Sequence, residues 1–307
     1  MRMNALRPKS GTFRLLWVLI WGPLSLFSAF GPLMVLNLLQ FPSIILLPFS
    51  TALFRTYNRN IAYAVWGWWA WSIQHLIGLR VNITGDEVPP KENAIVFSNH
   101  QGMSDIIIIM CLALAKGRVA DGKWMVKDVV KYVPGVGWGL LFVGCLFLKR
   151  NWADDEANIR RTFKTYVDGK VPLWLISFPE GTRVTASKLK ASQDYARQVG
   201  IQPTEHVMLP RSKGFAASVQ GLRGHVQAIY SITIGYHNDK VPTLPALIRG
   251  ELDEVTINVR RFLVQSLPVG EAALAAWLLE RFREDDAWMA KFKASAAPAI
   301  MSVKSSR

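Results

Sequence analysis

The sequence is poor in charged residues and in cysteine. Only 19% of its 307 residues are charged, while 50% are apolar, and this charged fraction is low for a soluble globular protein. The composition excludes an intrinsically disordered chain and a collagen-like repeat. The two cysteines, Cys111 and Cys145, are too few for a disulfide framework, so a cysteine-stapled secreted module is excluded and a reducing compartment is favoured.

Acidic residues are also scarce. There are 22 Asp and Glu against 36 Lys and Arg, which gives a formal net charge of +14. Such an excess is compatible with nucleic-acid binding, but the chain has no zinc-finger or RNP-type signature. Combined with the high apolar content and twelve tryptophans, the positive charge points first to anionic lipid. We therefore expect membrane phospholipids, and no nucleic acid, as partners.

The longest uncharged run lies near the N-terminus. No Asp, Glu, Lys or Arg occurs from Leu15 through Phe54, whereas one spanning helix needs roughly 20 apolar residues. Because basic residues flank both ends of the run, we expect both ends on the cytoplasmic side, as in a hairpin or two spans. A cleaved signal peptide is the alternative, but this run is too long and its following flank is basic. The flanking residues are Arg2, Arg7, Lys9 and Arg14 before the run and Arg55 and Arg59 after it.

A second uncharged stretch runs from Ile61 to Leu79 and contains four tryptophans. Tryptophan favours the headgroup layer of a membrane, while Gln74 and His75 disfavour a spanning helix. We interpret the stretch as an interfacial helix, with a third crossing or a buried core helix as alternatives. The sequence thus predicts a membrane-anchoring segment over residues 1–80, formed by a hairpin or two spans and an interfacial helix.

The pattern beyond residue 80 is that of an α/β domain. We predict a mixed sheet flanked by helices over residues 81–307, preceded by N-terminal membrane helices. The expected strands are Asn93–Ser98, Val171–Phe178, Ala228–Tyr236 and Glu254–Val264. The expected helices are Met103–Ala115, Trp152–Val167 and a C-terminal helix with Leu274, Leu278, Phe282, Met289 and Phe292 on one face.

One group of residues has a pattern suited to catalysis. His100 follows an expected strand, and Asp105 lies five residues later, where a helix begins. A carboxylate so placed can accept the Nδ1–H of the imidazole and support the imidazolium that forms when Nε2 takes a proton. With no evident serine or cysteine nucleophile nearby, the pair suits direct activation of a substrate hydroxyl. This spacing alone is weakly specific.

Two further motifs add positive charge. The turn Phe178-Pro179-Glu180-Gly181-Thr182-Arg183 ends an expected strand, where an arginine and turn N–H groups can hold a phosphate. The stretch from Gly144 ends in Lys149 and Arg150 after an apolar run.

These three motifs, in this order, resemble the glycerolipid acyltransferase family of the 1-acylglycerol-3-phosphate acyltransferase type. The resemblance covers roughly Asn93 to Val264, and N-H-x-x-x-x-D and F-P-E-G-T-R are its distinctive blocks. The stretch Leu209–Phe215 is similar to the branch that includes lysocardiolipin acyltransferases. Ala228–Tyr236 occupies the place of the family's fourth motif but lacks the proline often found there.

The resemblance implies a role for each motif. His100 is expected to be the general base and Asp105 its orienting carboxylate. The acceptor phosphate is expected to bind at Lys149, Arg150, Glu180, Gly181, Thr182 and Arg183. Glu180 could instead shape the turn, and Arg183 could form a surface ion pair. The apolar neighbours of Cys145 favour packing over nucleophilic attack, and the other four histidines are interpreted as structural.

The implied reaction moves an acyl group from acyl-CoA or acyl carrier protein to a lysophospholipid. The expected acceptor is 1-acyl-sn-glycerol 3-phosphate and the product is phosphatidic acid, with no metal and no bound cofactor. Another lysophospholipid acceptor is an alternative. A membrane-bound lipid hydrolase is a second alternative, although the chain has no G-x-S-x-G motif. We expect an integral membrane enzyme with its catalytic domain on the cytoplasmic face, in the inner membrane of a bacterium or the endoplasmic reticulum of a eukaryote.

Overall fold

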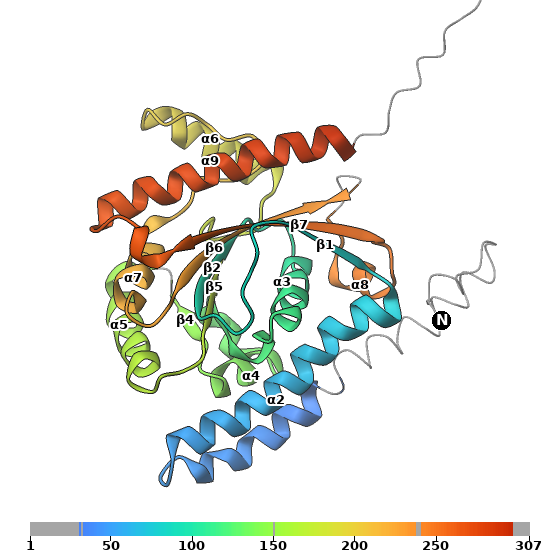
Figure 1. Cartoon of the computed structure of the whole chain (residues 1–307), viewed down its shortest axis with the longest axis vertical. Helices are drawn as coiled ribbons and strands as arrows, with labels where there is room; N and C mark the ends of the chain where they lie inside the picture. The colour runs from blue at the N-terminus through green and yellow to red at the C-terminus, as the bar shows by residue number, and fades with distance from the viewer. Residues whose placement is uncertain (1–30, 32, 150, 238–240, 297–307) are drawn as a thin grey trace, which may run out of the picture.

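A seven-stranded mixed sheet forms the centre of the protein (Figure 1). The structure is a computed structural model, which describes residues 31, 33–149, 151–237 and 241–296. The strand order is β1-β7-β6-β2-β5-β3-β4, and β2 to β6 run in one direction, with β7 antiparallel to β6 and parallel to β1. The strands are β1 (Arg80–Gly85), β2 (Ala94–Ser98), β3 (Gly122–Lys127), β4 (Leu146–Leu148), β5 (Trp174–Ser177), β6 (Ala228–Tyr236) and β7 (Glu254–Leu263).

Helices cover both faces of this sheet. The α-helices are α2 (Thr51–Ser72), α3 (Ser104–Ala115), α4 (Val136–Phe142), α5 (Trp152–Asp168), α6 (Ala186–Gln198), α7 (Ser212–Leu222), α8 (Leu244–Ile248) and α9 (Glu271–Ala296). Short 3₁₀ helices occupy Phe41–Leu46, Val119–Asp121, Asp128–Tyr132 and Val264–Ser266, and a π-helical turn, Ile73–Ile77, extends α2. The prediction of a mixed sheet flanked by helices is confirmed.

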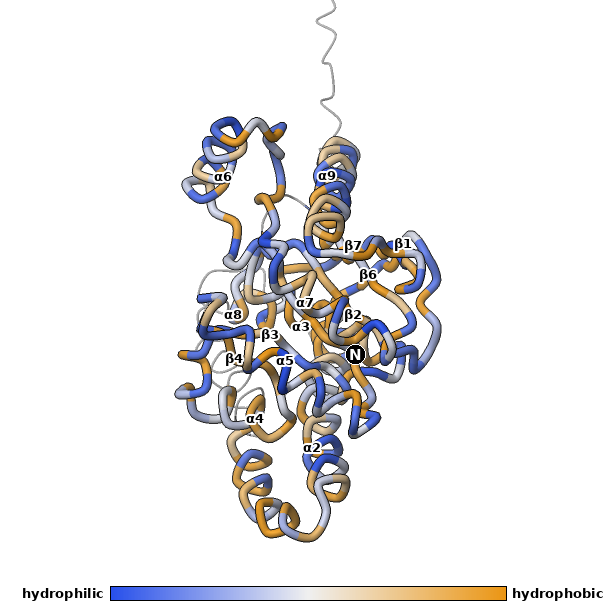
Figure 2. The backbone as a smooth tube through the Cα atoms, turned by 90° about the vertical axis from the view of Figure 1, so that its left-hand side faces the viewer, coloured by the Kyte–Doolittle hydropathy of each residue, from blue (hydrophilic) through white to orange (hydrophobic). Residues whose placement is uncertain are grey.

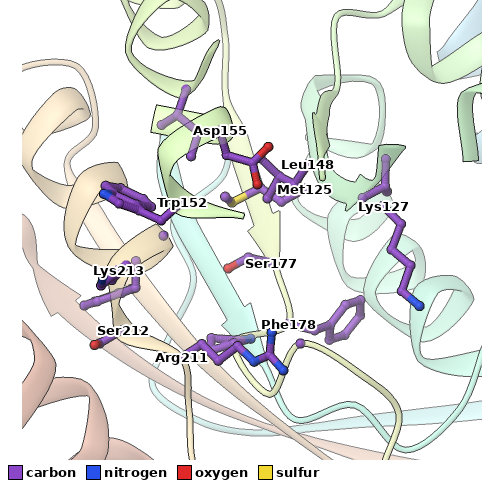
Figure 3. A pocket seen from close by; sticks show the side chains of 16 residues that line it. Met125, Lys127, Leu148, Trp152, Asp155, Ser177, Phe178, Arg211, Ser212 and Lys213 are labelled. Carbon is purple, nitrogen blue, oxygen red and sulfur yellow. The ribbon is translucent and has the colours of Figure 1, made fainter. Parts of the chain in front are cut away.

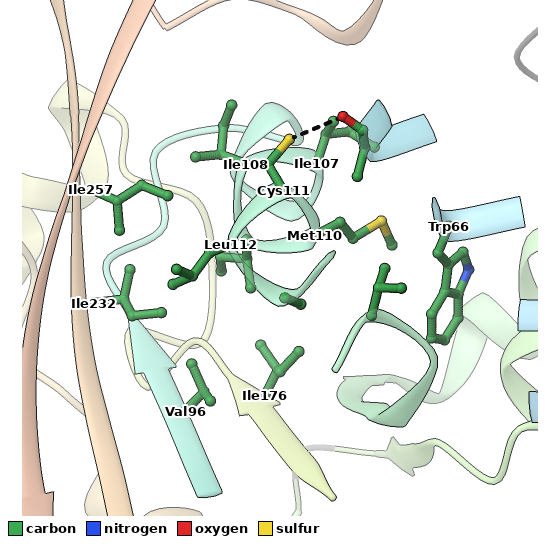
Figure 4. Close-up of a cluster of buried hydrophobic side chains, with 14 of the residues drawn as sticks. Trp66, Val96, Ile107, Ile108, Met110, Cys111, Leu112, Ile176, Ile232 and Ile257 are labelled. Carbon is green, nitrogen blue, oxygen red and sulfur yellow. Dashed lines mark hydrogen bonds between the residues drawn. The ribbon is translucent and has the colours of Figure 1, made fainter. Parts of the chain in front are cut away.

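Alternate residues of each central strand supply two separate hydrophobic cores. Val96 of β2 and Ile232 of β6 pack with α3 and α2 on one face, where Figure 4 shows Cys111 donating its S–H to the carbonyl oxygen of Ala70. Phe97 of β2 and Ile229 of β6, at odd-numbered positions of the same strands, pack with α5, α7 and α9 on the other face. Both faces of the sheet are buried, so its central strands are mainly apolar, with Ser98, Ser231 and Thr233 as buried polar exceptions.

The expected elements formed with small changes at their ends. The run of isoleucines at 106–109 is helical, because α3 is buried against both the sheet and α2, and this packing outweighs the strand preference of β-branched residues. The strand expected to reach Phe178 ends at Ser177, which places Phe178 in the loop beside the candidate site. The sequence pattern did not indicate β1, β3 or β4.

The N-terminal membrane helices are not found in the part of the chain that the structure describes. No helix within residues 31, 33–149, 151–237 and 241–296 is long and apolar enough to cross a bilayer, which also corrects the third crossing. The reason lies in α2, which begins inside the uncharged run but carries Arg55 and Arg59. The first 30 residues lie outside the described part, and membrane anchoring by residues 1–80 stays a prediction.

Residues 33–50 and α2 lie side by side as a helical hairpin at one end of the protein (Figures 1 and 2). The buried amide of Asn58 donates to the hydroxyl of Ser43 at 2.8 Å, and Tyr57 donates to the carbonyl of Leu39. Trp66 is buried against the α3 side of the sheet, whereas Trp68 and Trp71 are exposed. One face of α2 is therefore part of the protein core.

Candidate active site

His100 and Asp105 meet at the carboxyl end of β2. The strand ends at Ser98, and α3 begins at Ser104, so the intervening turn brings the two side chains together. The distance from His100 Nδ1 to Asp105 Oδ2 is 2.9 Å. Because a carboxylate only accepts, Nδ1 carries the proton and Nε2 is left as the basic nitrogen. Among the described residues, Nε2 has no hydrogen-bond partner.

The carboxylate of Asp105 is fixed by three more donors. Its Oδ2 accepts the backbone N–H groups of Gln101 and Gly102, at 2.7 and 2.9 Å, and its Oδ1 accepts the hydroxyl of Tyr236 at 2.6 Å. The Asp105 side chain is 0% exposed, so these bonds set its orientation. Burial and the nearby carboxylate raise the pKa of Tyr236 well above its usual value, and its hydroxyl remains a donor.

Glu180 supports the main chain around His100. Its two carboxyl oxygens accept the N–H of His100 at 2.8 Å and the N–H of Met208 at 3.3 Å. The residue is 3% exposed, and burial raises the pKa of Glu180 to about 8, although both N–H groups oppose the rise. Glu180 thus shapes the turn, and its contact with an acceptor phosphate stays a prediction.

A cavity of about 380 Å³ lies on the far side of Phe178, next to the dyad but not lined by His100 itself. The ring of Phe178, which lines this cavity, stacks on His100 with centroids 4.0 Å apart. Figure 3 shows the cavity between β5, the beginning of α5 and the beginning of α7. Its wall combines apolar and basic side chains, namely Met125, Leu148, Trp152, Ile159 and Phe215 with Lys127, Arg211 and Lys213.

The other described phosphate-ligand candidates lie on two separate segments of the chain, the turn after β5 and the end of β4. Gly181 lines the cavity with a φ of +72°, and a Cβ there would lie 3.1 Å from Arg211 Nε, so glycine suits this position. Thr182 accepts from Lys188 Nζ at 2.7 Å, and Arg183 is exposed on the same turn. Lys149 is exposed after β4, and β5 and β3 separate β4 from β2. Arg150 lies outside the described residues.

Residues 204–211 form a strap, and the sequence had singled out only its last three residues, as part of Leu209–Phe215. Asp286 of α9 accepts the N–H groups of Glu205, His206 and Val207 at 2.6 to 3.2 Å. The next N–H, of Met208, binds Glu180. The strap leads directly into the α7 residues that line the cavity, so α9 positions both Glu180 and one cavity wall. A single aspartate on a helix gives no sequence signal for such a contact.

Cys145 is buried directly before β4, which β5 and β3 separate from β2. Its sulfur accepts the backbone N–H of Trp124 at 3.3 Å, and burial raises the pKa of its thiol to about 11. A thiol held in this protonated state is a poor nucleophile. Within the described residues, no group of three or more His, Cys, Asp or Glu side chains could hold a metal ion.

Comparison with known proteins assigns the chain to a family. The Acyltransferase family profile matches residues 80–243, and the Acyltransferase C-terminus profile matches residues 246–297. The chain is 33% identical to 1-acyl-sn-glycerol-3-phosphate acyltransferase 3 of Arabidopsis thaliana over 84% of its own length and 70% of that protein. It is 30% identical to 1-acyl-sn-glycerol-3-phosphate acyltransferase gamma of Mus musculus, over 85% and 70% of the two chains.

Two further similarities extend this picture. Lysocardiolipin acyltransferase 1 of Danio rerio is 32% identical over 72% of this chain and 58% of that protein. The fold is similar to the crystal structure of the 1-acyl-sn-glycerophosphate acyltransferase PlsC from Thermotoga maritima, with a TM-score of 0.55, 18% identity and coverage of 90% and 98%. The family profiles and these relatives agree with the resemblance in the motifs. The chain therefore belongs to the acyltransferase family, and it is an O-acyltransferase.

Proposed function

We propose that the protein transfers a fatty acyl group from acyl-CoA or acyl carrier protein to the free hydroxyl of 1-acyl-sn-glycerol 3-phosphate, giving phosphatidic acid. The observation that carries this proposal is the His100–Asp105 pair, with Nδ1 bound at 2.9 Å and Nε2 free. The names of the relatives at 30 and 33% identity support the choice of acceptor.

His100 acts as the general base in this reaction. Its Nε2 takes the proton of the acceptor hydroxyl while the hydroxyl oxygen attacks the thioester carbonyl. The tetrahedral intermediate collapses, the carbon–sulfur bond breaks, and the thiolate leaves with the proton returned by His100. Asp105 stabilises the imidazolium between these two steps, and its own orientation is set by Gln101, Gly102 and Tyr236.

The acceptor phosphate binds near Arg183 in this proposal. The exposed guanidinium follows the Gly181 turn, and a planar guanidinium can bind two phosphate oxygens at once. Arg211 and Lys213 add positive charge at the adjacent cavity, and Thr182, Lys149 and Arg150 are further candidate ligands. Residues 1–80 would hold the enzyme at a membrane surface, with the catalytic domain on its cytoplasmic face.

A second candidate acceptor is another lysophospholipid. The similarity to lysocardiolipin acyltransferase 1 favours this alternative, because both acceptor classes present a free hydroxyl and a phosphate group. The dyad serves either acceptor in the same way.

An acyl-transfer assay tests the proposal. Purified protein is incubated with radiolabelled oleoyl-CoA and lysophosphatidic acid, and lipid products are separated. We expect labelled phosphatidic acid from the wild type, activity reduced by about 10²-fold or more in His100→Ala, and full activity in the control His75→Ala, whose exposed ring stacks on Trp71.

Different outcomes would identify the alternatives. Faster labelling of monolysocardiolipin than of lysophosphatidic acid would move the proposal to the second acceptor. Release of free oleate in place of acyl transfer would indicate a hydrolase. Unchanged turnover in His100→Ala would contradict the proposed base.

A further inference from the structure

A second cavity lies at the amino ends of the parallel strands, whereas His100 lies at their carboxyl ends. It encloses about 540 Å³ between the beginning of α2, the end of α4 and the end of α5. Lys123, near the start of β3, lines it and pairs with Leu175, which in turn pairs with Ile95 of β2. β2 ends three residues beyond Ile95 and His100 follows in the turn, so at about 3.3 Å per residue Lys123 lies about 10 Å along the strands from the end of β2.

The cavity has more positive than negative charge. Arg55, Arg59 and Lys123 line it together with one carboxylate, Asp121. This carboxylate already forms ion pairs with Arg59, at 2.5 Å, and with Arg118, which does not line the cavity, at 2.8 Å. Within the described residues Arg55 has no ion pair. The three cations of the wall therefore outnumber its single carboxylate, which two arginines already share.

The ammonium group of Lys123 is short of hydrogen-bond acceptors. The residue is 6% exposed, and its Nζ donates to the carbonyl of Val143 at 2.6 Å. An ammonium group has three N–H donors, so two of them have no acceptor among the described residues. Burial lowers the pKa of Lys123, and an anionic oxygen in the cavity would offset the cost of burying the charge.

Beside the hydroxyl-bearing residues Thr51, Thr56, Thr165 and Tyr166, the wall has an apolar part that continues to an apolar surface. Leu47, Phe54, Leu141 and Phe142 line the cavity. Beside Leu47, the tip of the helical hairpin exposes Phe49, at 82%, and Ile45, at 69%, and Figure 2 shows this end of the molecule as largely hydrophobic. An occupant that fits such a site has an anionic head and an apolar tail.

We propose that this cavity binds the phosphate of an anionic phospholipid, with the phosphate at Arg55 and Lys123 and the acyl chains along the apolar hairpin tip. The lipid bound here is not a substrate, because its position is at the amino ends of the strands and the dyad lies at their carboxyl ends. Charge complementarity selects an anion, and the adjoining apolar surface selects a lipid over free phosphate. The proposal does not depend on the acceptor assigned above.

Native mass spectrometry of the full chain in nonionic detergent tests this site. Dioleoyl phosphatidylglycerol is titrated without acyl donor, and dioleoyl phosphatidylcholine serves as the lipid of zero net charge. We expect Arg55→Gln and Lys123→Met each to weaken phosphatidylglycerol binding by about tenfold or more, as for the loss of a charge-assisted hydrogen bond. Arg197→Gln, which removes an exposed arginine of α6, and His100→Ala should bind like the wild type.

Acyl transfer in detergent micelles should be unchanged in Arg55→Gln and Lys123→Met, which separates this proposal from the catalytic one. If Lys123→Met does not fold, Arg55→Gln carries the test because its side chain is only partly buried. Equal phosphatidylglycerol affinity in Arg55→Gln and Arg197→Gln would overturn the site. The assignment to an anionic lipid would be overturned if the wild type bound phosphatidylcholine as tightly as phosphatidylglycerol. It would also be overturned if inorganic phosphate displaced phosphatidylglycerol at about one tenth of the lipid concentration.

Discussion

Asp105→Asn removes one negative charge from the dyad while leaving its shape. The structure determines how the new amide would turn. The Oδ2 position faces two backbone N–H groups, of Gln101 and Gly102, besides the His100 ring. An NH₂ group there would face donors only, so the amide oxygen should take this position and still accept Nδ1–H. The NH₂ group would then face Tyr236, whose hydroxyl can rotate to accept.

The cost therefore comes from the lost charge and not from a misplaced ring. At an effective dielectric of about 20 and a separation of ~4 Å, a carboxylate stabilises an imidazolium by about 4 kcal/mol. A neutral hydrogen bond would retain about 1 kcal/mol of this. The remaining loss of about 3 kcal/mol corresponds to a decrease in kcat of roughly 10²-fold.

Steady-state kinetics with saturating donor and acceptor measure this value, and thermal unfolding checks that the variant is folded. Tyr236→Phe is the matched companion, because it removes one of the four donors to Asp105 and leaves the charge; we expect about a tenfold loss. A decrease of 10⁴-fold or more in Asp105→Asn would show that the ring had adopted the wrong tautomer, as in a serine-protease triad. A decrease below about fivefold would refute the electrostatic role of Asp105.

Four further outcomes are expected. Because burial raises the pKa of Glu180 from 4.5 to about 8, the folded protein retains a proton that the unfolded chain loses in this window. The free energy of unfolding should therefore fall as the pH rises from about 5 to 8, by up to about 1.4 kcal/mol per pH unit, and denaturation of Glu180→Gln should lack this contribution. Arg183→Lys should raise the acceptor KM by about tenfold with less effect on the donor KM; no change in this variant or in Arg183→Ala would exclude the residue from the site. Cys145→Ala should retain turnover within about twofold, since the protonated thiol is unreactive, and a trapped acyl-cysteine would contradict direct attack. Asp286→Ala should release the strap and raise the acceptor KM by about tenfold, and Asp286→Asn should have a smaller effect. Equal acceptor KM values in the wild type and both variants would show that Asp286 is not needed to hold the strap.

The local sequence was sufficient to predict the elements around the dyad. The strand before His100, the helix that begins near Asp105 and the strand that ends at Tyr236 all formed, because each has a strong apolar pattern over a short range. The pairing of His100 with Asp105 followed for the same reason, since the two residues are separated by a single turn. The apolar face of α9 was also readable, and Leu274, Leu278, Phe282 and Met289 are buried as expected.

The N-terminal region shows where composition was insufficient. The absence of charge from Leu15 to Phe54 predicted spans, but α2 crosses the end of this run and continues through Arg55 and Arg59. Whether an apolar segment packs on a protein or enters a bilayer depends on the surfaces that it meets, and here α3 provides a protein surface for one face of α2.

Sequence by itself determined the family and the local pairing of His100 with Asp105 beside a glycine turn. Tertiary structure decided the contacts between residues far apart in the chain. Tyr236 reaches Asp105 across 131 positions, and Asp286 reaches the strap across about 80. Such contacts depend on strand order and on the docking of α9, which no local pattern encodes. The cavity at Lys123 likewise exists only because α2, α4 and α5 meet at one edge of the sheet.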